Sequence, residues 1–265
     1  MSEKQIVDFS VGSGSVSCLS LFEMPTSDFA DGLRNRLKDR LPVFMHIPKT
    51  AGSSLQRDLQ KQFKNGFRVD WEKIDQSWSE FIGRHQQKPF HHVRGHISVK
   101  HLDQLKTAGV EFVAFSFLRH PLDRLVSNYT YCISASSPRC VTNRKKYPTL
   151  TAFMNENLQP NHMTRLIVGE CDSAEQAIER IGADYGFIGL TEFYKLSNEI
   201  LLPALGGCFE TLPRINVTQR DRNFRVTNET VDEILETQAI DLQVFEFFRS
   251  RYQELSSRSR LNQAA

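Results

Sequence analysis

Short apolar runs alternate with amphipathic stretches along most of this chain of 265 residues. The apolar runs predict buried strands at 42–47, 90–93, 111–118 and 187–190. Between and after them, apolar residues recur every three or four positions, which is typical of helices. The expected helices span 53–63, 78–85, 99–108, 121–133, 150–158, 173–183, 192–205 and 241–255, with one more beginning at 227 or 228. The polar, basic stretches 136–148 and 213–227 are expected to be loops.

Strands that alternate with helices predict an α/β fold, in which a central parallel sheet is flanked by helices on both faces. Ligands of such sheets bind outside the carboxyl ends of the strands. We expect a single domain over residues 41–256. Residues 1–40 are weakly patterned and are expected to form an N-terminal arm, and residues 257–265 a short C-terminal tail.

The composition is that of an ordinary globular protein, with 40% hydrophobic and 24% charged residues. A net charge of +2 is too balanced to favour nucleic acid as a partner. No stretch approaches the roughly 20 apolar residues of a membrane span, and the first residues lack a secretory pattern, so we expect a cytoplasmic protein. The five cysteines have no Cys-x-x-Cys spacing, which argues against structural zinc. Whether Cys132 and Cys140 pair depends on the compartment, and the oligomeric state stays open.

The segment 43–55 reads Val-Phe-Met-His-Ile-Pro-Lys-Thr-Ala-Gly-Ser-Ser-Leu and carries the clearest chemistry. A strand ends in a tight turn that opens into a helix, where unpaired amides and the helix dipole attract an anion. The turn supplies a point charge from Lys49, hydroxyl donors and a close backbone approach, through Thr50, Gly52, Ser53 and Ser54. We therefore expect a P-loop-like site for a nucleotide-like polyanion. Its lysine precedes the glycine, unlike the order in Gly-x-x-x-x-Gly-Lys-[Ser/Thr].

Two further segments place polar residues at the same sheet edge. Residues 115–129 put Arg119 at the end of a strand and Ser127 two turns into the next helix. Arg119 could instead pair with Asp123, and Ser127 could simply face solvent. His96 follows a glycine at the end of a short strand, and an imidazole pKa of about 6.5 suits a general base.

The order Pro-Lys-Thr-Ala-Gly-Ser-Ser resembles the 5′-phosphosulfate loop of sulfotransferases that use 3′-phosphoadenosine 5′-phosphosulfate (PAPS). The segment from Arg119 to Tyr129 resembles their 3′-phosphate loop, and Phe-x-His-Ile-Pro-Lys-Thr-Ala-Gly is similar to the branch with the heparan and uronyl 2-O-sulfotransferases. The resemblance extends from 43 to about 252. It implies PAPS as co-substrate and no metal. The residues implied in PAPS binding are Lys49, Thr50, Ala51, Gly52, Ser53, Ser54, Arg119, Ser127, Arg220 and Arg222.

The resemblance also implies catalytic and acceptor residues. His96 matches the second histidine of a family His-Gly-His and is implied as general base, with Arg94 in place of the first histidine. Lys49 is implied to stabilise the leaving group. Asn161-His-Met-Thr-Arg165 resembles a segment whose arginine faces the acceptor, so Arg94, Asn161 and Arg165 are candidates for acceptor binding. Arg165 could equally be a solvated residue at a helix start, and the loop with Arg220 and Arg222 a solvated surface.

The function that we expect is in-line transfer of a sulfuryl group from PAPS to a hydroxyl of an acceptor. The resemblance implies a carbohydrate acceptor, and a uronate-containing glycan would suit a basic cleft formed by Arg94, Arg139, Arg144, Lys145, Lys146 and Arg165. An anionic lipid headgroup could use the same charges. One alternative is a P-loop kinase-like phosphotransferase, and another is a nucleotide- or glycan-binding module without turnover.

Overall fold

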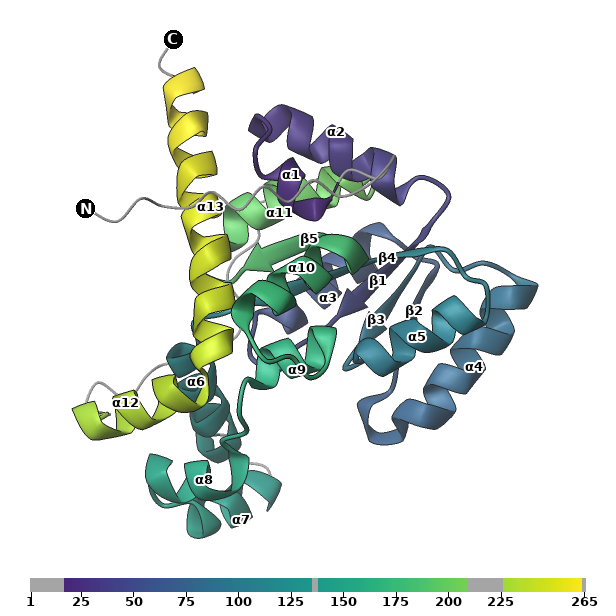
Figure 1. Cartoon of the computed structure of the whole chain (residues 1–265). Coiled ribbons are helices and arrows are strands. Elements are labelled where there is room, and N and C mark those ends of the chain that lie inside the picture. The colour runs from purple at the N-terminus through teal and green to yellow at the C-terminus, as the bar shows by residue number, and fades with distance from the viewer. Residues whose placement is uncertain (1–16, 135–137, 209–225, 264–265) are drawn as a thin grey trace.

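A computed structural model describes residues 17–134, 138–208 and 226–263, and the statements below concern those residues. Its centre is a five-stranded, entirely parallel sheet (Figure 1). Across the sheet the order is β2 (Gly66–Arg68), β3 (His92–Gly95), β1 (Leu41–Met45), β4 (Phe112–Leu118) and β5 (Tyr185–Leu190). The prediction of an α/β fold with a central parallel sheet is confirmed.

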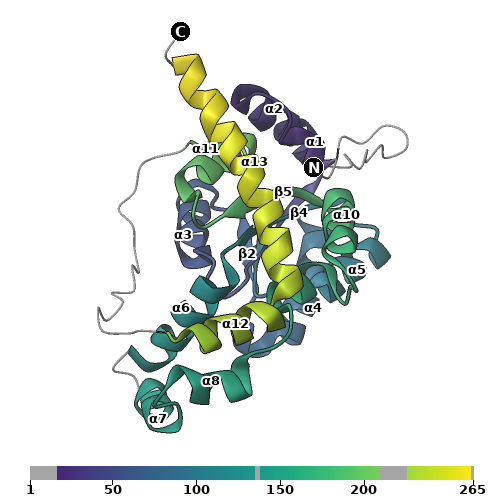
Figure 2. The same ribbon diagram turned by 60° about the vertical axis from the view of Figure 1, so that its left-hand side comes forward.

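Helices connect and cover these strands on both faces (Figures 1 and 2). In chain order they are α1 (Cys18–Leu21), α2 (Thr26–Leu37), α3 (Gly52–Gln62), α4 (Ile74–Gln87), α5 (Val99–Thr107), α6 (Pro121–Ser134), α7 (Pro138–Lys146), α8 (Leu150–Asn157), α9 (His162–Val168), α10 (Ala174–Asp184), α11 (Tyr194–Ala204), α12 (Asn228–Thr237) and α13 (Ala239–Gln263). A short 3₁₀ helix, η1 (Trp71–Lys73), follows β2. None of these helices combines the length and the apolar character needed to cross a bilayer.

Contacts to the central strand β1 show which helix covers which face. Gly52, the first residue of α3, lies against the ring of His46, just beyond β1. On the opposite face, the buried Tyr185 hydroxyl of β5 lies 2.8 Å from Met45 Sδ of β1 and donates to the Ile167 carbonyl of α9 at 2.7 Å. Because all strands are parallel, the turns after β1, β3 and β4 lie at one edge of the sheet.

A second, smaller apolar core lies beside that edge. Helices α6, α7, α8 and α12 gather below the sheet in both ribbon views (Figures 1 and 2). The buried side chains of this core are Leu125, Val126, Tyr129, Tyr147, Leu150, Phe153, Met154 and Ile234. This lobe anchors α6, whose first turns follow β4 directly.

The structure differs from the sequence-based elements in two places near the site. The expected loop 136–148 is wrong for residues 138–146, which form α7. Nothing periodic in this polar segment predicted a helix; it is fixed by packing on α6, where Asn143 donates to the Cys132 carbonyl at 3.3 Å. Strand β2 was not predicted, because it has only three residues and begins with a glycine.

The ends of the chain also differ from the expected arm and tail. Helices α1 and α2 pack into the main core through Cys18, Leu21, Phe22, Phe29 and Leu33, all at most 1% exposed. These apolar residues recur at helical spacing, but many Ser and Asp residues lie between them, so the sequence analysis did not recognise them as a buried helix face. At the other end, α13 continues through Gln263.

Candidate functional site

The turn between β1 and α3 has a backbone suited to an anion. Lys49 and Ala51 both adopt left-handed conformations, with φ of 72° and 64°, which are uncommon for residues other than glycine. Ala51 is the N-cap of α3, and no side chain caps its first amides. Alternating left-handed residues that lead into an uncapped helix start leave N–H groups available to an anion. Strain at two positions so close together is typical of functional loops.

The hydroxyls of this turn are not equivalent. Thr50 is fully buried and donates to the Ile47 carbonyl at 2.9 Å, so its hydroxyl holds the turn together. Ser53 is exposed and Ser54 is half-buried in the first turn of α3. The two serine side chains are therefore more accessible than that of Thr50.

His46 is a site residue that the sequence analysis did not single out, although it lies in the motif itself. It is buried beneath the loop, and its Nδ1 lies 3.0 Å from Nε2 of Gln56 on α3. Since an amide nitrogen only donates, Nδ1 accepts and the ring proton resides on Nε2. Burial, with nearby positive charge, lowers the pKa of His46 to about 3, so the ring is neutral at physiological pH.

His96 lies directly against this neutral ring. The two imidazoles stack with centroids 4.3 Å apart and an interplanar angle of 28°. Burial lowers the pKa of His96 below its usual value; the nearby backbone of His46 raises it, and the positive charge of Arg68 lowers it. The ring is therefore largely unprotonated at neutral pH, which is the state a general base requires.

The loops after β1 and β4 meet through Arg119. Its Nη1 donates to the Lys49 carbonyl at 3.2 Å. Burial and the positive charge of Arg119 lower the pKa of Lys49. The Lys49 ammonium lies 4.0 Å from the ring centroid of Tyr131 on α6. Ser127 is buried one turn before Tyr131, and residues four apart share a helix face. The structure thus brings Lys49, Arg119 and Ser127 together.

The three residues predicted to contact an acceptor are placed differently. Arg94 is only 6% exposed, and its Nη1 lies 2.7 Å from Nε2 of His92. Arg165 is exposed and pairs with Glu170 at 2.6 Å. Asn161 accepts from the Ile240 amide at 2.9 Å and so caps the start of α13. Among these, Arg165 alone presents its charge at the surface.

Asn161 takes part in a reciprocal arrangement between two helix starts. The buried Asp241 of α13 accepts from the amides of Met163 and Thr164 in α9, at 2.9 and 2.8 Å. Each helix therefore caps the other. These two caps hold the start of α9 against the start of α13, so Asn161 has a structural role.

Other residues of the site carry little or no sequence signal, or cannot be placed. Arg68 ends β2 and pairs in register with Arg94 on β3; its charge lowers the pKa of His46, His96 and Arg94. It escaped prediction because β2 did. Arg220 and Arg222 lie outside the described residues.

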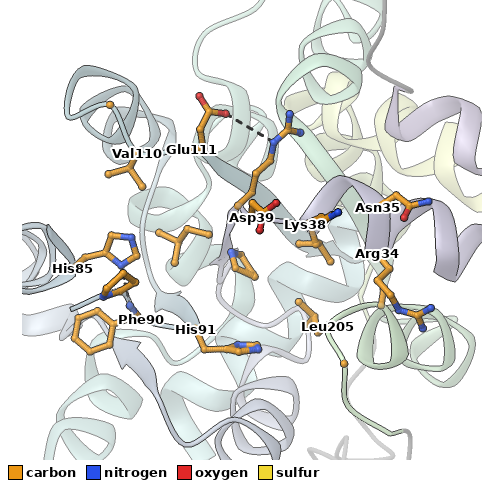
Figure 3. Close-up of a pocket in the computed structure, with 18 of the residues that line it drawn as sticks. Arg34, Asn35, Lys38, Asp39, His85, Phe90, His91, Val110, Glu111 and Leu205 are labelled. Atoms are coloured by element: carbon orange, nitrogen blue, oxygen red, sulfur yellow. Dashed lines mark hydrogen bonds and ion pairs between the residues drawn. The ribbon is translucent and has the colours of Figure 1, made fainter. Parts of the chain in front are cut away.

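A hollow of about 940 Å³ lies elsewhere, at the amino ends of the strands (Figure 3). It is lined by Leu41 and Pro42 at the start of β1, and by Val110 and Glu111 just before β4. Glu111 forms an ion pair with Arg40 at 3.8 Å. None of the predicted site residues lines this hollow, so the candidate site is at the opposite sheet edge.

Comparisons with known proteins were made for the whole chain. A model described as the sulfotransferase family matches residues 38–176, a span that contains Lys49, His96 and Arg119. The fold is similar to that of mouse sulfotransferase SULT7A1 complexed with PAP, with 13% identity, a TM-score of 0.43, and coverage of 80% of this chain and 69% of that chain. No curated protein matches. The family match covers more than half of the chain and confirms the predicted family: the chain belongs to the sulfotransferase family.

Proposed function

We propose that this sulfotransferase transfers the sulfuryl group of PAPS to a hydroxyl of a carbohydrate that carries acidic groups. The observation that supports this most is the contact of Arg119 with the Lys49 carbonyl. It brings the phosphosulfate-type loop after β1 next to the arginine after β4. A donor with phosphate at both ends of its ribose can engage both at once.

The donor is held from two sides. The amides of residues 49–54, with Ser53 and Ser54, bind the 5′-phosphosulfate at the start of α3. Arg119 pairs with the 3′-phosphate, for which its planar guanidinium is suited, and Ser127 adds a hydroxyl. The resemblance assigns Arg220 and Arg222 to the same phosphate.

His96 and Lys49 carry the chemistry. The unprotonated His96 takes the proton of the acceptor hydroxyl as that oxygen attacks sulfur. The new O–S bond forms while the bond from sulfur to the bridging phosphate oxygen breaks, and adenosine 3′,5′-bisphosphate leaves. Lys49 moves from the Tyr131 ring to the bridging oxygen, where negative charge develops. Burial and the positive charge of Arg119 both lower the pKa of Lys49.

The acidic acceptor is inferred from the charge of the neighbouring surface. Helix α7 has four basic residues and no acidic residue. Arg165 is a further candidate contact, whereas Arg94 is buried against His92.

Transfer of labelled sulfate from PAPS to a panel of glycans tests the proposal. The parent protein is expected to label uronate-bearing chains, and His96→Ala to lose transfer while its affinity for adenosine 3′,5′-bisphosphate stays within about twofold. A thermal shift that is larger with Mg-ATP than with PAPS would favour a kinase-like phosphotransferase. Binding of PAPS without transfer to any acceptor would favour a binding module.

A further inference from the structure

The contacts that connect Lys49 to His96 form a closed series of neighbouring residues, which we call the site ring. It passes from the turn after β1 to α6, then to the start of α7, to the segment after β2, and back through the end of β3. The first links are Lys49 on the Tyr131 ring at 4.0 Å and Cys140 Sγ near the Tyr131 carbonyl at 3.9 Å. Arg139, the neighbour of Cys140, lies over the ring of Trp71 at 5.6 Å.

The remaining links return to the two histidines. Two residues before Trp71, the Val69 amide donates to the Arg94 carbonyl at 2.9 Å. Val69 also packs against Gly95, where an added Cβ would meet its side chain at 2.8 Å. His96 follows, and its ring stacks on His46 at the base of the loop. This run of contacts connects Trp71 and Arg139 to the two histidines.

The exposed large hydrophobic side chains of the described residues lie on these same elements. Three large ones stand out, Trp71 at 48%, Tyr131 at 61% and Val141 at 42% exposure. The first two belong to the site ring, and Val141 lies two residues beyond Arg139 on α7. An apolar patch with a basic border beside a reaction site is typical of a ligand-binding surface. Lys49 lies close over the Tyr131 ring, whereas Arg139 lies farther from the Trp71 ring and leaves 48% of that residue exposed.

We propose that Trp71 and Arg139 form the acceptor subsite and that its ligand is an anionic sugar ring. The apolar C–H face of the sugar stacks on the exposed indole, while a carboxylate or sulfate on the ring pairs with the Arg139 guanidinium. Arg144 and Lys145, further along α7, are exposed and extend the positive charge toward neighbouring sugars. A neutral phenol would use the indole but would gain nothing from these cations. The proposal rests on the proposed function, because it names the acceptor of that same site.

Steady-state kinetics with matched variants test the subsite. Trp71→Ala should raise the KM for a uronate-bearing polysaccharide about tenfold and leave the KM for PAPS unchanged, whereas Trp71→Phe should retain most of the affinity. Arg139→Gln should raise that KM but not the KM for a neutral glycan of equal length. Arg84→Gln is the control, since Arg84 also lies over aromatic rings, Phe67 and Phe90 at 5.7 and 5.3 Å, outside the site ring. An unchanged acceptor KM in Trp71→Ala, or equal losses for PAPS and acceptor, overturns the subsite.

Intrinsic fluorescence gives a second readout that does not depend on turnover. The chain has two tryptophans, and Trp78 is 2% exposed, so a glycan that stacks on the protein should change the emission of Trp71. Titration with the uronate-bearing polysaccharide should change the fluorescence of the parent but not of Trp71→Phe. A response with no sulfate transfer would keep the subsite and reject the proposed function. No response to the polysaccharide, or a response only to anionic lipid vesicles or to p-nitrophenol, would reject the sugar ligand.

Discussion

Gly52 is the position where one added methyl group should disturb the site most. A Cβ on Gly52 would lie 1.8 Å from Cδ2 and 1.9 Å from Nε2 of His46. Carbon atoms in contact settle at about 3.5–4.0 Å, so the imidazole would have to withdraw by roughly 2 Å. It has no free direction, because Gln56 holds Nδ1 and the His96 ring covers one face. The displaced His46 ring should therefore move His96 as well.

We expect Gly52→Ala to lower the free energy of unfolding by about 2 kcal/mol, or about 6 °C in Tm, as overpacked cores do. A displacement of about 1 Å at the base should lower kcat about 100-fold. Denaturant titration and sulfate transfer measure the two effects. In a His46→Ala background the methyl group has room, so the same Gly52→Ala change should be nearly neutral for stability, which a double-mutant cycle reports as a coupling above about 1 kcal/mol.

Gly83 offers a matched control in α4. Nothing lies within 4 Å of a Cβ at that position, so Gly83→Ala should raise stability by about 0.5–1 kcal/mol through helix propensity alone. If Gly52→Ala is as stable and active as the parent, or costs the same with and without His46, then the ring is not held between α3 and His96 and the reasoning is refuted.

Three further predictions concern charge. Arg119→Ala should weaken binding of adenosine 3′,5′-bisphosphate by about 2–5 kcal/mol in calorimetry and leave adenosine 5′-phosphate little changed; an equal loss for both would contradict a 3′-phosphate role. Because the pKa of His96 is lowered, kcat/KM should rise with pH and reach its plateau with a midpoint below 6.5; a midpoint above 7 would point to another base. Because salt screens charges, added salt should raise the Tm of the free protein and reduce the Tm increment given by the bisphosphate. Both salt effects should be smaller in Arg68→Gln, and equal effects in the two proteins would contradict this.

The fold was predictable wherever an apolar run was long enough. Residues 112–118 form β4 close to the predicted limits, and Pro121 begins α6 as its position after a strand suggested. Prediction failed where the backbone depends on distant partners. The three residues of β2 are a strand only because β3 pairs with them, and α7 has no apolar period and depends on its contacts with α6.

The same distinction divides the candidate site. Lys49, His96 and Arg119 follow neighbouring parallel strands, so their convergence follows from topology that the sequence indicates. Contacts between side chains that lie far apart in the chain cannot be predicted from this topology. The role of Asn161 is set by an amide 79 residues away, and Arg94 turns to His92 rather than to an acceptor. The position of each motif therefore predicted that its residues lie at this edge of the sheet, but not the direction in which each side chain points.

Positive charge gathers at this edge, and among the described carboxylates Glu192 is one that the charge of Arg119 reaches. Arg119 lowers the pKa of Lys49, and Arg68 lowers those of His96 and Arg94, so the cations repel one another where burial already disfavours charge. The two left-handed residues of the loop add conformational strain. A polyanion relieves the repulsion and uses the loop amides at once, which makes its binding stabilise the fold. In the proposed reaction, negative charge moves onto the bridging oxygen, so we expect the same cations to stabilise the transition state more than the bound donor.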